Sequence, residues 1–301
     1  MKMYNPVGMI PAMPTPFNKE GNVDFEAYKN LIDHLIAGGM HCLLAGGSTG
    51  EYSLMSMEER KSVLKAAVEY ANGRAPIMAG TSAHRTEDTL ELTKYAAEIG
   101  ADCALVVTPY YMKTSEEGIK NYYKTLAAES GIGIVIYHYP AATNVELSPE
   151  LIAELSQVEG IVGVKNTTDQ EHTCKVIGLT KDQKNFSVLT GFEHLILPTL
   201  AVGGHGATGI IHNLVPKEIV KMYNLFKEEG DINSAIALNQ RLLPLYDYVE
   251  AEPVPGPVKA GLDLIGLNGG EVRAPLVPAS EELNSKMKET LLQLGYEVNP
   301  V

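Results

Sequence analysis

The chain has few cysteines and few basic residues for its length. Three cysteines occur in 301 residues, at positions 42, 103 and 174. They are too few and too scattered for a disulfide framework or a zinc-binding motif, so we expect a reducing, cytoplasmic location. The 24 lysines and arginines are outnumbered by 37 acidic residues, which gives a formal charge of −13. Because phosphate groups are bound by clustered cations, we expect neither a nucleic acid nor an anionic membrane as partner. A small-molecule substrate fits this composition better.

Long apolar runs are also missing. Residues 1–10 contain no apolar core of the kind found in secretion signals, and no segment approaches the ~18 apolar residues of a transmembrane helix. We therefore expect neither secretion nor membrane insertion. With 45% hydrophobic residues, the chain can still bury a large core.

Short apolar segments are present instead, and they alternate with polar stretches of helical periodicity. In the first polar stretch, for example, Phe25, Tyr28, Leu31, Ile32 and Leu35 recur at intervals of three and four residues. Strands that alternate with helices of this length indicate right-handed βαβ units and a parallel sheet. Eight such repeats favour a closed (β/α)8 TIM barrel over an open sheet. The expected strand segments are residues 7–17, 41–48, 76–82, 102–109, 133–140, 161–167, 186–193 and 206–213.

No linker or low-complexity break divides the chain before about residue 215. We therefore assign residues 1–215 to the barrel and residues 216–301 to a C-terminal helical extension packed on it, as one structural unit. The extension carries periodic apolar runs, interrupted by the proline-rich stretch 252–257.

Lys165 is the most informative residue of the chain. It ends the apolar run 160–164 and is followed at once by the polar stretch 166–169, so it lies at the end of a predicted buried strand. Burial disfavours the charged ammonium and lowers its pKa, which produces the neutral amine that attacks a carbonyl group to form an imine. The alternative is that Lys165 extends out of the strand end to solvent or pairs with Asp169.

The other predicted strand ends are rich in hydroxyl groups. In a barrel the chemistry lies at the C-terminal ends of the strands. Gly47 precedes Ser48 and Thr49 there, so the backbone could approach a ligand closely while hydroxyl and amide groups donate to a carboxylate. Tyr137 ends the strand before that of Lys165 and could transfer protons for an adjacent amine. Its alternative role is that of a core aromatic residue with a satisfied hydroxyl.

Together these segments resemble a known family. GGSTGE at 46–51, TPYY at 108–111, YHYP at 137–140 and GVKNT at 163–167 are similar, in order and spacing, to the dihydrodipicolinate synthase and N-acetylneuraminate lyase family of Schiff-base aldolases. The resemblance extends from PAMPTPF at 11–17 to APLVP at 274–278. It implies a (β/α)8 barrel, usually in a homotetramer built as a dimer of dimers. It also implies catalysis through a lysine imine with pyruvate or another 2-oxo acid, with no metal or nucleotide cofactor.

The resemblance also implies roles for individual residues. Lys165 matches the imine lysine and Tyr137 the proton-transfer tyrosine of the family. Ser48 and Thr49 resemble the pair that binds the pyruvoyl carboxylate and relays protons. Tyr111 is similar to the tyrosine that reaches across a subunit interface to complete the relay. The expected substrate-binding residues are Thr49, Gly47, Thr167, Gly191, Glu193, His194 and Thr208.

The subfamily is indicated by an arginine that is missing. Synthases of this family carry an arginine after strand five for the carboxylate of the aldehyde substrate, where this chain has Ala142. The chain has five arginines, and none follows strands four to eight within the barrel. A bidentate guanidinium is hard to replace, so synthase activity, the condensation of pyruvate with aspartate semialdehyde, is kept as the alternative function.

The main hypothesis for the substrate is therefore a 2-keto-3-deoxy sugar acid or a sialate-like compound. YHYPAAT is closer to 2-keto-3-deoxygluconate aldolases, and GF at 191–192 resembles sialate lyases. Glu193, His194 and Ile210 depart from the sialate lyase pattern, so the glycerol tail of a sialic acid would lose partners. We expect an uncharged, polyhydroxylated aldehyde held by Thr167, Glu193 and His194, with Asn166 as a further candidate.

Two hypotheses that do not involve a Schiff-base aldolase remain. His138, His194 and His212 lie near predicted strand ends, as in a metal-dependent barrel enzyme. Alternation argues against this site, because a strand that points Tyr137 into the barrel points His138 outward. A barrel that only binds ligands is the other reading, but it would not require Lys165 and Tyr137 together.

Overall fold

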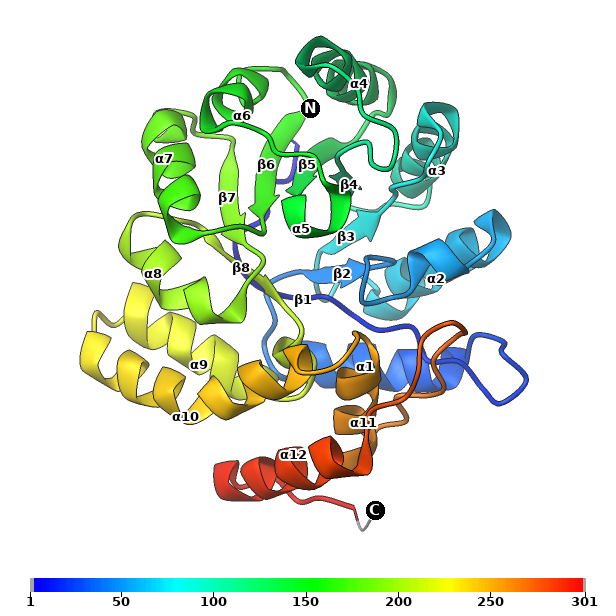
Figure 1. The fold of residues 1–301 in the computed structure, drawn as a ribbon, viewed down its shortest axis with the longest axis vertical. Helices are drawn as coiled ribbons and strands as arrows, with labels where there is room; N and C mark the ends of the chain where they lie inside the picture. The colour runs from blue at the N-terminus through cyan, green and yellow to red at the C-terminus, as the bar shows by residue number, and fades with distance from the viewer. Residues whose placement is uncertain (1–2, 300–301) are drawn as a thin grey trace.

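The computed structural model describes residues 3–299 and shows eight parallel strands in one sheet. Each strand pairs with its neighbours in chain order, and β1 pairs with β8. A bridge between Ala12 and Leu44 joins β1 to β2 and closes the ring. The prediction of a (β/α)8 barrel is thereby confirmed (Figure 1). The strands are β1 Gly8–Pro11, β2 Leu43–Ala45, β3 Ile77–Gly80, β4 Cys103–Val107, β5 Gly133–His138, β6 Ile161–Asn166, β7 Ser187–Thr190 and β8 Gly206–Gly209.

Helices follow the strands and form the outer layer (Figure 1). Their starts agree with local capping signals. In α2, for instance, Ser56 accepts the amide of Glu59 and Glu59 accepts the amide of Ser56, which satisfies two amide groups that the helix itself leaves free. The helices are α1 Phe25–Ala37, α2 Met57–Ala71, α3 Thr86–Glu98, α4 Glu116–Glu129, α5 Pro140–Thr143, α6 Pro149–Leu155, α7 Gln170–Thr180, α8 Ile196–Ala201, α9 Pro216–Lys227, α10 Ile232–Glu250, α11 Gly256–Leu264 and α12 Glu281–Leu294. Short 3₁₀ turns lie at η1 Tyr52–Leu54, η2 Glu193–Leu195 and η3 Ile211–Asn213.

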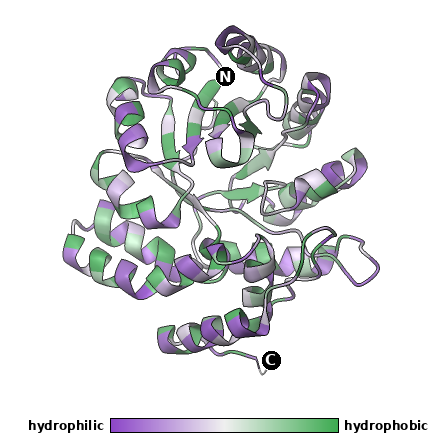
Figure 2. Cartoon of the chain, viewed as in Figure 1, coloured by the Kyte–Doolittle hydropathy of each residue, from purple (hydrophilic) through white to green (hydrophobic). Residues whose placement is uncertain are grey.

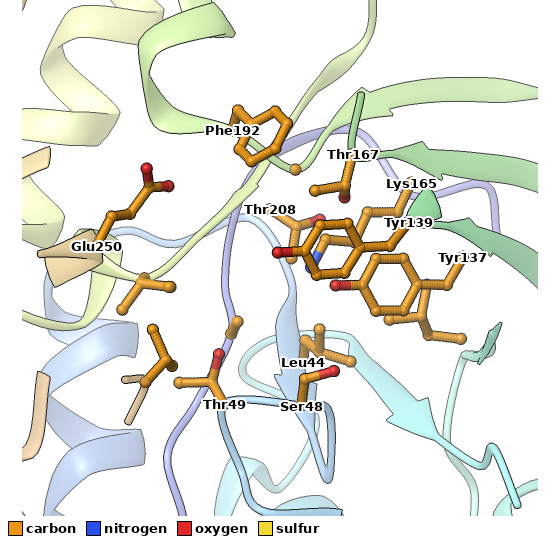
Figure 3. A pocket seen from close by; sticks show the side chains of 15 residues that line it. Leu44, Ser48, Thr49, Tyr137, Tyr139, Lys165, Thr167, Phe192, Thr208 and Glu250 are labelled. Carbon is orange, nitrogen blue, oxygen red and sulfur yellow. The ribbon is translucent and has the colours of Figure 1, made fainter. Parts of the chain in front are cut away.

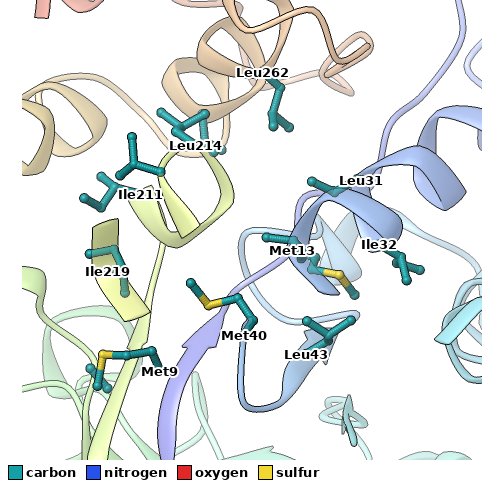
Figure 4. Packing of buried hydrophobic residues seen from close by; sticks show 14 of the residues in the cluster. Met9, Met13, Leu31, Ile32, Met40, Leu43, Ile211, Leu214, Ile219 and Leu262 are labelled. Carbon is teal, nitrogen blue, oxygen red and sulfur yellow. The ribbon is translucent and has the colours of Figure 1, made fainter. Parts of the chain in front are cut away.

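The strands are buried on both faces because helices cover the outside and side chains fill the inside. All six residues of β5 are buried, in agreement with the apolar run at residues 133–136 with which the strand begins. Apolar residues are concentrated on the strands and on the inner sides of the helices (Figure 2). Figure 4 shows one part of this core, where Met9 of β1, Leu43 of β2, Ile32 of α1 and Ile219 of α9 are buried in one hydrophobic cluster.

The C-terminal helices lie beside the barrel (Figure 1). Helix α9 contacts both β1 and α10, and α10 in turn contacts α11 and α12. The C-terminal end of α10 reaches the mouth of the barrel, where it contributes to the cavity described below. Within residues 3–299, no helix is both long and apolar enough to cross a membrane.

Candidate active site

A cavity of about 320 Å³ opens at the C-terminal ends of the strands. Seven of the predicted site residues line it: Ser48, Thr49, Tyr137, Lys165, Thr167, Gly191 and Thr208. Lys165 and the two tyrosines Tyr137 and Tyr139 lie on one side, opposite Ser48 and Thr49 (Figure 3). The βα loops that follow β2, β5, β6 and β7 thus meet around one lysine.

Lys165 lies on β6, directly beside Tyr137 of β5 in the sheet register. Its side chain is buried, with 7% of the residue exposed, and its Nζ lies 4.3 Å from the centre of the Tyr137 ring. Burial lowers the pKa of Lys165 to about 8, although the carboxylate of Glu193 opposes this shift. Asp169 does not pair with Lys165 but caps α7 by accepting the amide of His172. The local environment therefore increases the fraction of neutral amine near pH 7 compared with an exposed lysine.

Tyr137, which pairs with Lys165 in the register of the sheet, is a buried phenol. Burial raises the pKa of Tyr137 to about 12, and the neighbouring hydroxyls of Ser48 and Thr167 limit the rise. The phenol therefore stays protonated at neutral pH and is suited to relay protons between hydroxyl groups. The ring of Tyr139 stacks on Tyr137 at 5.9 Å and 17° between planes, which restricts its orientation.

Gly191 leaves the space into which Lys165 extends. A Cβ atom at this position would lie 2.9 Å from Lys165 Cε and 2.9 Å from Thr167 Cβ. Both side chains would have to move to accommodate it. The lack of a side chain at Gly191, directly after β7, thus leaves room for the side chain of Lys165.

Glu193 and His194, which we expected to contact substrate, do not line the cavity. The carboxylate of Glu193 is buried and accepts the backbone amides of Ile210 and, at 3.2 Å, Ile211. His194 Nε2 lies 2.9 Å from Asp247 Oδ1 at the surface. Both residues belong to the 3₁₀ turn η2, which follows β7.

Two further residues, Asn166 and Gly47, occupy other places than the sequence suggested. Asn166 is buried on the outer face of β6, where its side chain binds His138 and His172, so it is not available to substrate. Gly47 lies in the loop after β2 but does not line the cavity. Tyr111 is 89% exposed in the single chain, with φ of 71°. Its role across a subunit interface stays a prediction, as does the homotetramer.

The three histidines that suggested a metal site, His138, His194 and His212, do not lie together. His138 binds Asn166 behind the sheet, and His212 Nδ1 lies 3.0 Å from the carbonyl of Ile10. His194 is at the surface beside Asp247. In the part of the chain from residue 3 to residue 299, no three His, Cys, Asp or Glu side chains form a cluster that could hold a metal ion. The positions of these histidines therefore do not support the hypothesis of a metal-dependent barrel enzyme.

Sequence reasoning did not assign the other eight lining residues of the cavity to the site, among them Tyr139, Phe192, Glu250 and Val254. Glu250 ends α10 and lies across the cavity from Tyr137 (Figure 3). It was missed because the extension was treated as an appendage. The break in periodicity at the proline-rich stretch 252–257 was the available signal that this part of the chain turns toward the barrel.

A buried ion pair supports the loop that carries Ser48 and Thr49. Lys259 Nζ of α11 lies 2.5 Å from Glu51 Oε1, and each residue is 2% exposed. The other oxygen of Glu51 accepts the amide of Arg273 at 2.8 Å. Glu51 has a positive φ of 59°, a conformation that these contacts help to hold. The partners lie 208 positions apart in the sequence, which explains why the sequence did not reveal the pair.

A barrel with one buried, pKa-lowered lysine beside a tyrosine at its C-terminal mouth has the site of a class I Schiff-base aldolase, an enzyme of the lyase class. The chain belongs to the dihydrodipicolinate synthetase family, whose model matches residues 5–294.

Known relatives agree with this assignment over almost the whole chain. The chain is 36% identical to 4-hydroxy-tetrahydrodipicolinate synthase of Bacillus velezensis over 284 residues, which covers 94% of this chain and 97% of the relative. The crystal structure of dihydrodipicolinate synthase from Thermotoga maritima matches with a TM-score of 0.93 at 32% identity, over 97% of this chain and 99% of the other. YagE, a prophage protein of the dihydrodipicolinic acid synthase family from E. coli K12, was solved in complex with pyruvate. It matches with a TM-score of 0.92 at 30% identity, over 96% and 99% of the two chains. The synthase names agree with the function kept as the alternative above, rather than with a 2-keto-3-deoxygluconate aldolase or sialate lyase subfamily.

Proposed function

We propose that Lys165 forms an imine with pyruvate or a related 2-oxo acid, and that the resulting enamine is joined to, or released from, an aldehyde. The observation that carries this proposal is the buried Lys165 amine beside Tyr137 in a cavity large enough for a small molecule. The pyruvate complex of a structural relative supports the choice of 2-oxo acid.

The chemistry follows from the groups around the amine. Neutral Nζ of Lys165 attacks C2 of the 2-oxo acid, the carbonyl oxygen leaves as water, and one proton is consumed to give the iminium ion. Loss of a C3 proton then moves an electron pair into the enamine double bond and neutralises the nitrogen. Tyr137 takes this proton at its oxygen while it passes its own to a neighbouring hydroxyl, Ser48 or Thr167, which in turn passes its own proton to the water released in the first step. Ser48 and Thr49 lie opposite Lys165, where they would hold the carboxylate of the 2-oxo acid (Figure 3).

Two second substrates have support of different kinds. The names of the relatives favour the synthase reaction, in which the aldehyde is aspartate semialdehyde. The cavity favours an aldehyde without a carboxylate, because Lys165 is the one basic residue among the lining residues and Glu250 is the one acid. Burial raises the pKa of Glu250, with the charge of His194 opposing the shift.

The cavity chemistry leads us to propose a 2-keto-3-deoxy sugar acid as the substrate, with the synthase reaction as the second candidate. A carboxylate at the position of Glu250 accepts hydrogen bonds from sugar hydroxyls and repels the carboxylate of the semialdehyde. Ala142, where family synthases carry an arginine, is exposed on α5 and offers no group that replaces a guanidinium.

The substrate proposal is tested by comparing two reactions on the parent and on Ala142→Arg. We expect the parent to have the higher kcat/KM for retro-aldol cleavage of a 2-keto-3-deoxy sugar acid. Ala142→Arg is expected to raise kcat/KM for the semialdehyde by roughly one to two decades, the value of a charge-assisted hydrogen bond of about 1.5 to 3 kcal/mol. Ala142→Gln, a long side chain without charge, is the matched control and should give little improvement. A parent that already prefers the semialdehyde at ordinary synthase efficiency would show that the second candidate is correct.

A further inference from the structure

The strands that carry Lys165 and Tyr137 are also joined on their outer faces. In the register of β5 and β6, Tyr137 pairs with Lys165 and His138 pairs with Asn166. Because successive residues of a strand point to opposite faces, the second pair points away from the cavity toward the helices. His138 and Asn166 are both completely buried. A direct side-chain contact between them therefore holds the two strands together one residue beyond the reactive pair.

Four residues close a ring of hydrogen bonds in this position. His138 Nδ1 lies 2.7 Å from Asn166 Oδ1, and Asn166 Nδ2 lies 3.1 Å from His172 Nδ1. His172 Nε2 lies 2.8 Å from the carbonyl oxygen of Leu147, and the amide of Leu147 donates to His138 Nε2 at 3.1 Å. The ring thus connects β5, β6, the start of α7 and the segment that leads from α5 to α6.

One assignment of protons satisfies every member of the ring. The Leu147 amide is a donor, so His138 Nε2 accepts and His138 Nδ1 carries the proton that it donates to Asn166 Oδ1. The Leu147 carbonyl is an acceptor, so His172 Nε2 donates to it and His172 Nδ1 accepts from Asn166. The second Asn166 amide proton goes to Thr173 Oγ1 at 3.0 Å, which itself donates to the carbonyl of Asp169 at 2.9 Å. Both imidazoles are therefore neutral, and all groups are satisfied.

We propose that His138, Asn166 and His172 are positioning residues that fix the distance between the Lys165 amine and the Tyr137 hydroxyl. This inference rests on the proposed imine chemistry. The contacts act directly on the strand ends that carry the reactive pair, and the Leu147 contacts hold the segment that follows Tyr139 and α5 at the cavity wall. Displacement of reacting groups by about 1 Å is enough to cost roughly 10²-fold in rate.

The hydrogen bonds of the ring require both imidazoles to be neutral. Protonation of either imidazole would replace an acceptor by a donor and set two donors against each other. Burial lowers the pKa of His138 to about 4, and the contact with Asn166 opposes this shift. The carboxylate of Asp169, next to the ring, accepts the backbone amide of His172 at 2.8 Å.

The test uses pyruvate alone, so that it does not depend on the aldehyde. Exchange of the C3 protons of pyruvate in D₂O, followed by NMR, reports proton transfer through the enamine. The amount of borohydride-reduced adduct at equilibrium reports imine formation. We expect Asn166→Ala to slow C3 exchange about 10- to 100-fold. The equilibrium amount of adduct and the KM for pyruvate should stay within about threefold, because Lys165 and the hydroxyls opposite it remain.

A matched control separates positioning from loss of stability. His205 Nδ1 accepts the amide of Val188 at 3.1 Å, at the N-terminal end of the barrel and remote from the cavity. His205→Leu removes an imidazole contact of the same kind, and we expect it to lower the melting temperature without slowing C3 exchange. His172→Phe, which opens the ring but keeps the His138 to Asn166 contact, should slow exchange about 3- to 10-fold and provides the test if Asn166→Ala does not fold.

The outcomes distinguish a failure of the imine proposal from a failure of the proposal that the ring positions the reactive pair. If the parent gives no borohydride adduct with any 2-oxo acid, the imine proposal itself is wrong. If the parent gives the adduct and C3 exchange in both Asn166→Ala and His172→Phe is no slower than in His205→Leu, the ring is structural only and our inference is overturned. Slower exchange with unchanged adduct supports it.

Discussion

Replacing Lys165 by arginine is expected to abolish turnover, with a loss of roughly 10⁴-fold or more, because a guanidinium is not deprotonated and cannot form the imine. In the parent, borohydride reduction in the presence of pyruvate should label Lys165 covalently, and peptide mapping by mass spectrometry identifies the labelled residue. The labelling rate should rise with pH. With a pKa of about 8, about a tenth of Lys165 is neutral at pH 7, and the neutral fraction approaches its maximum above pH 9.

Lys259 is an internal control in the same experiment. It is as deeply buried as Lys165, and burial lowers its pKa, but its amine is paired with Glu51 outside the cavity. We expect no label on Lys259. A label that persists in Lys165→Arg, or the failure of every 2-oxo acid to label the parent, would show that the chemistry does not use this amine.

The strand content and the position of Lys165 could be predicted because both depend on local sequence. An apolar run that ends in a single lysine specifies a buried strand and a desolvated amine without knowledge of any other element. Alternation along β5 was sufficient to direct His138 away from the cavity, and the structure places it there.

The parts that could not be predicted depend on loop geometry and on long-range contacts. Glu193 and His194 follow a strand end, as Thr167 does, but they belong to a 3₁₀ turn and do not line the cavity, and no spacing rule reveals that turn. Glu250 and Lys259 meet the barrel from the C-terminal extension. Their partners are far away in the sequence, so periodicity could identify their helices but not what those helices contact.

Tyr137→Phe is expected to lower turnover by roughly 10²- to 10⁴-fold while the fold is kept, which is the usual loss for a positioned acid-base group. The phenyl ring preserves the packing against Tyr139 and the contact with the Lys165 amine, so only the hydroxyl is removed. C3 exchange of pyruvate should fall with turnover, whereas borohydride should still trap the imine at equilibrium. Steady-state kinetics together with the exchange rate measures both effects.

Tyr123→Phe is the matched control for this variant. Tyr123 is a completely buried tyrosine of α4 whose hydroxyl donates to the carbonyl of Val106 at 3.1 Å, outside the cavity. Its loss should cost about 1 kcal/mol of stability and leave turnover unchanged. If Tyr137→Phe lowers turnover no more than Tyr123→Phe does, Tyr137 is a core aromatic and another group transfers the proton. If EDTA abolishes the parent activity and zinc restores it, a metal ion does the work assigned here to the lysine and the phenol, and the imine mechanism is wrong.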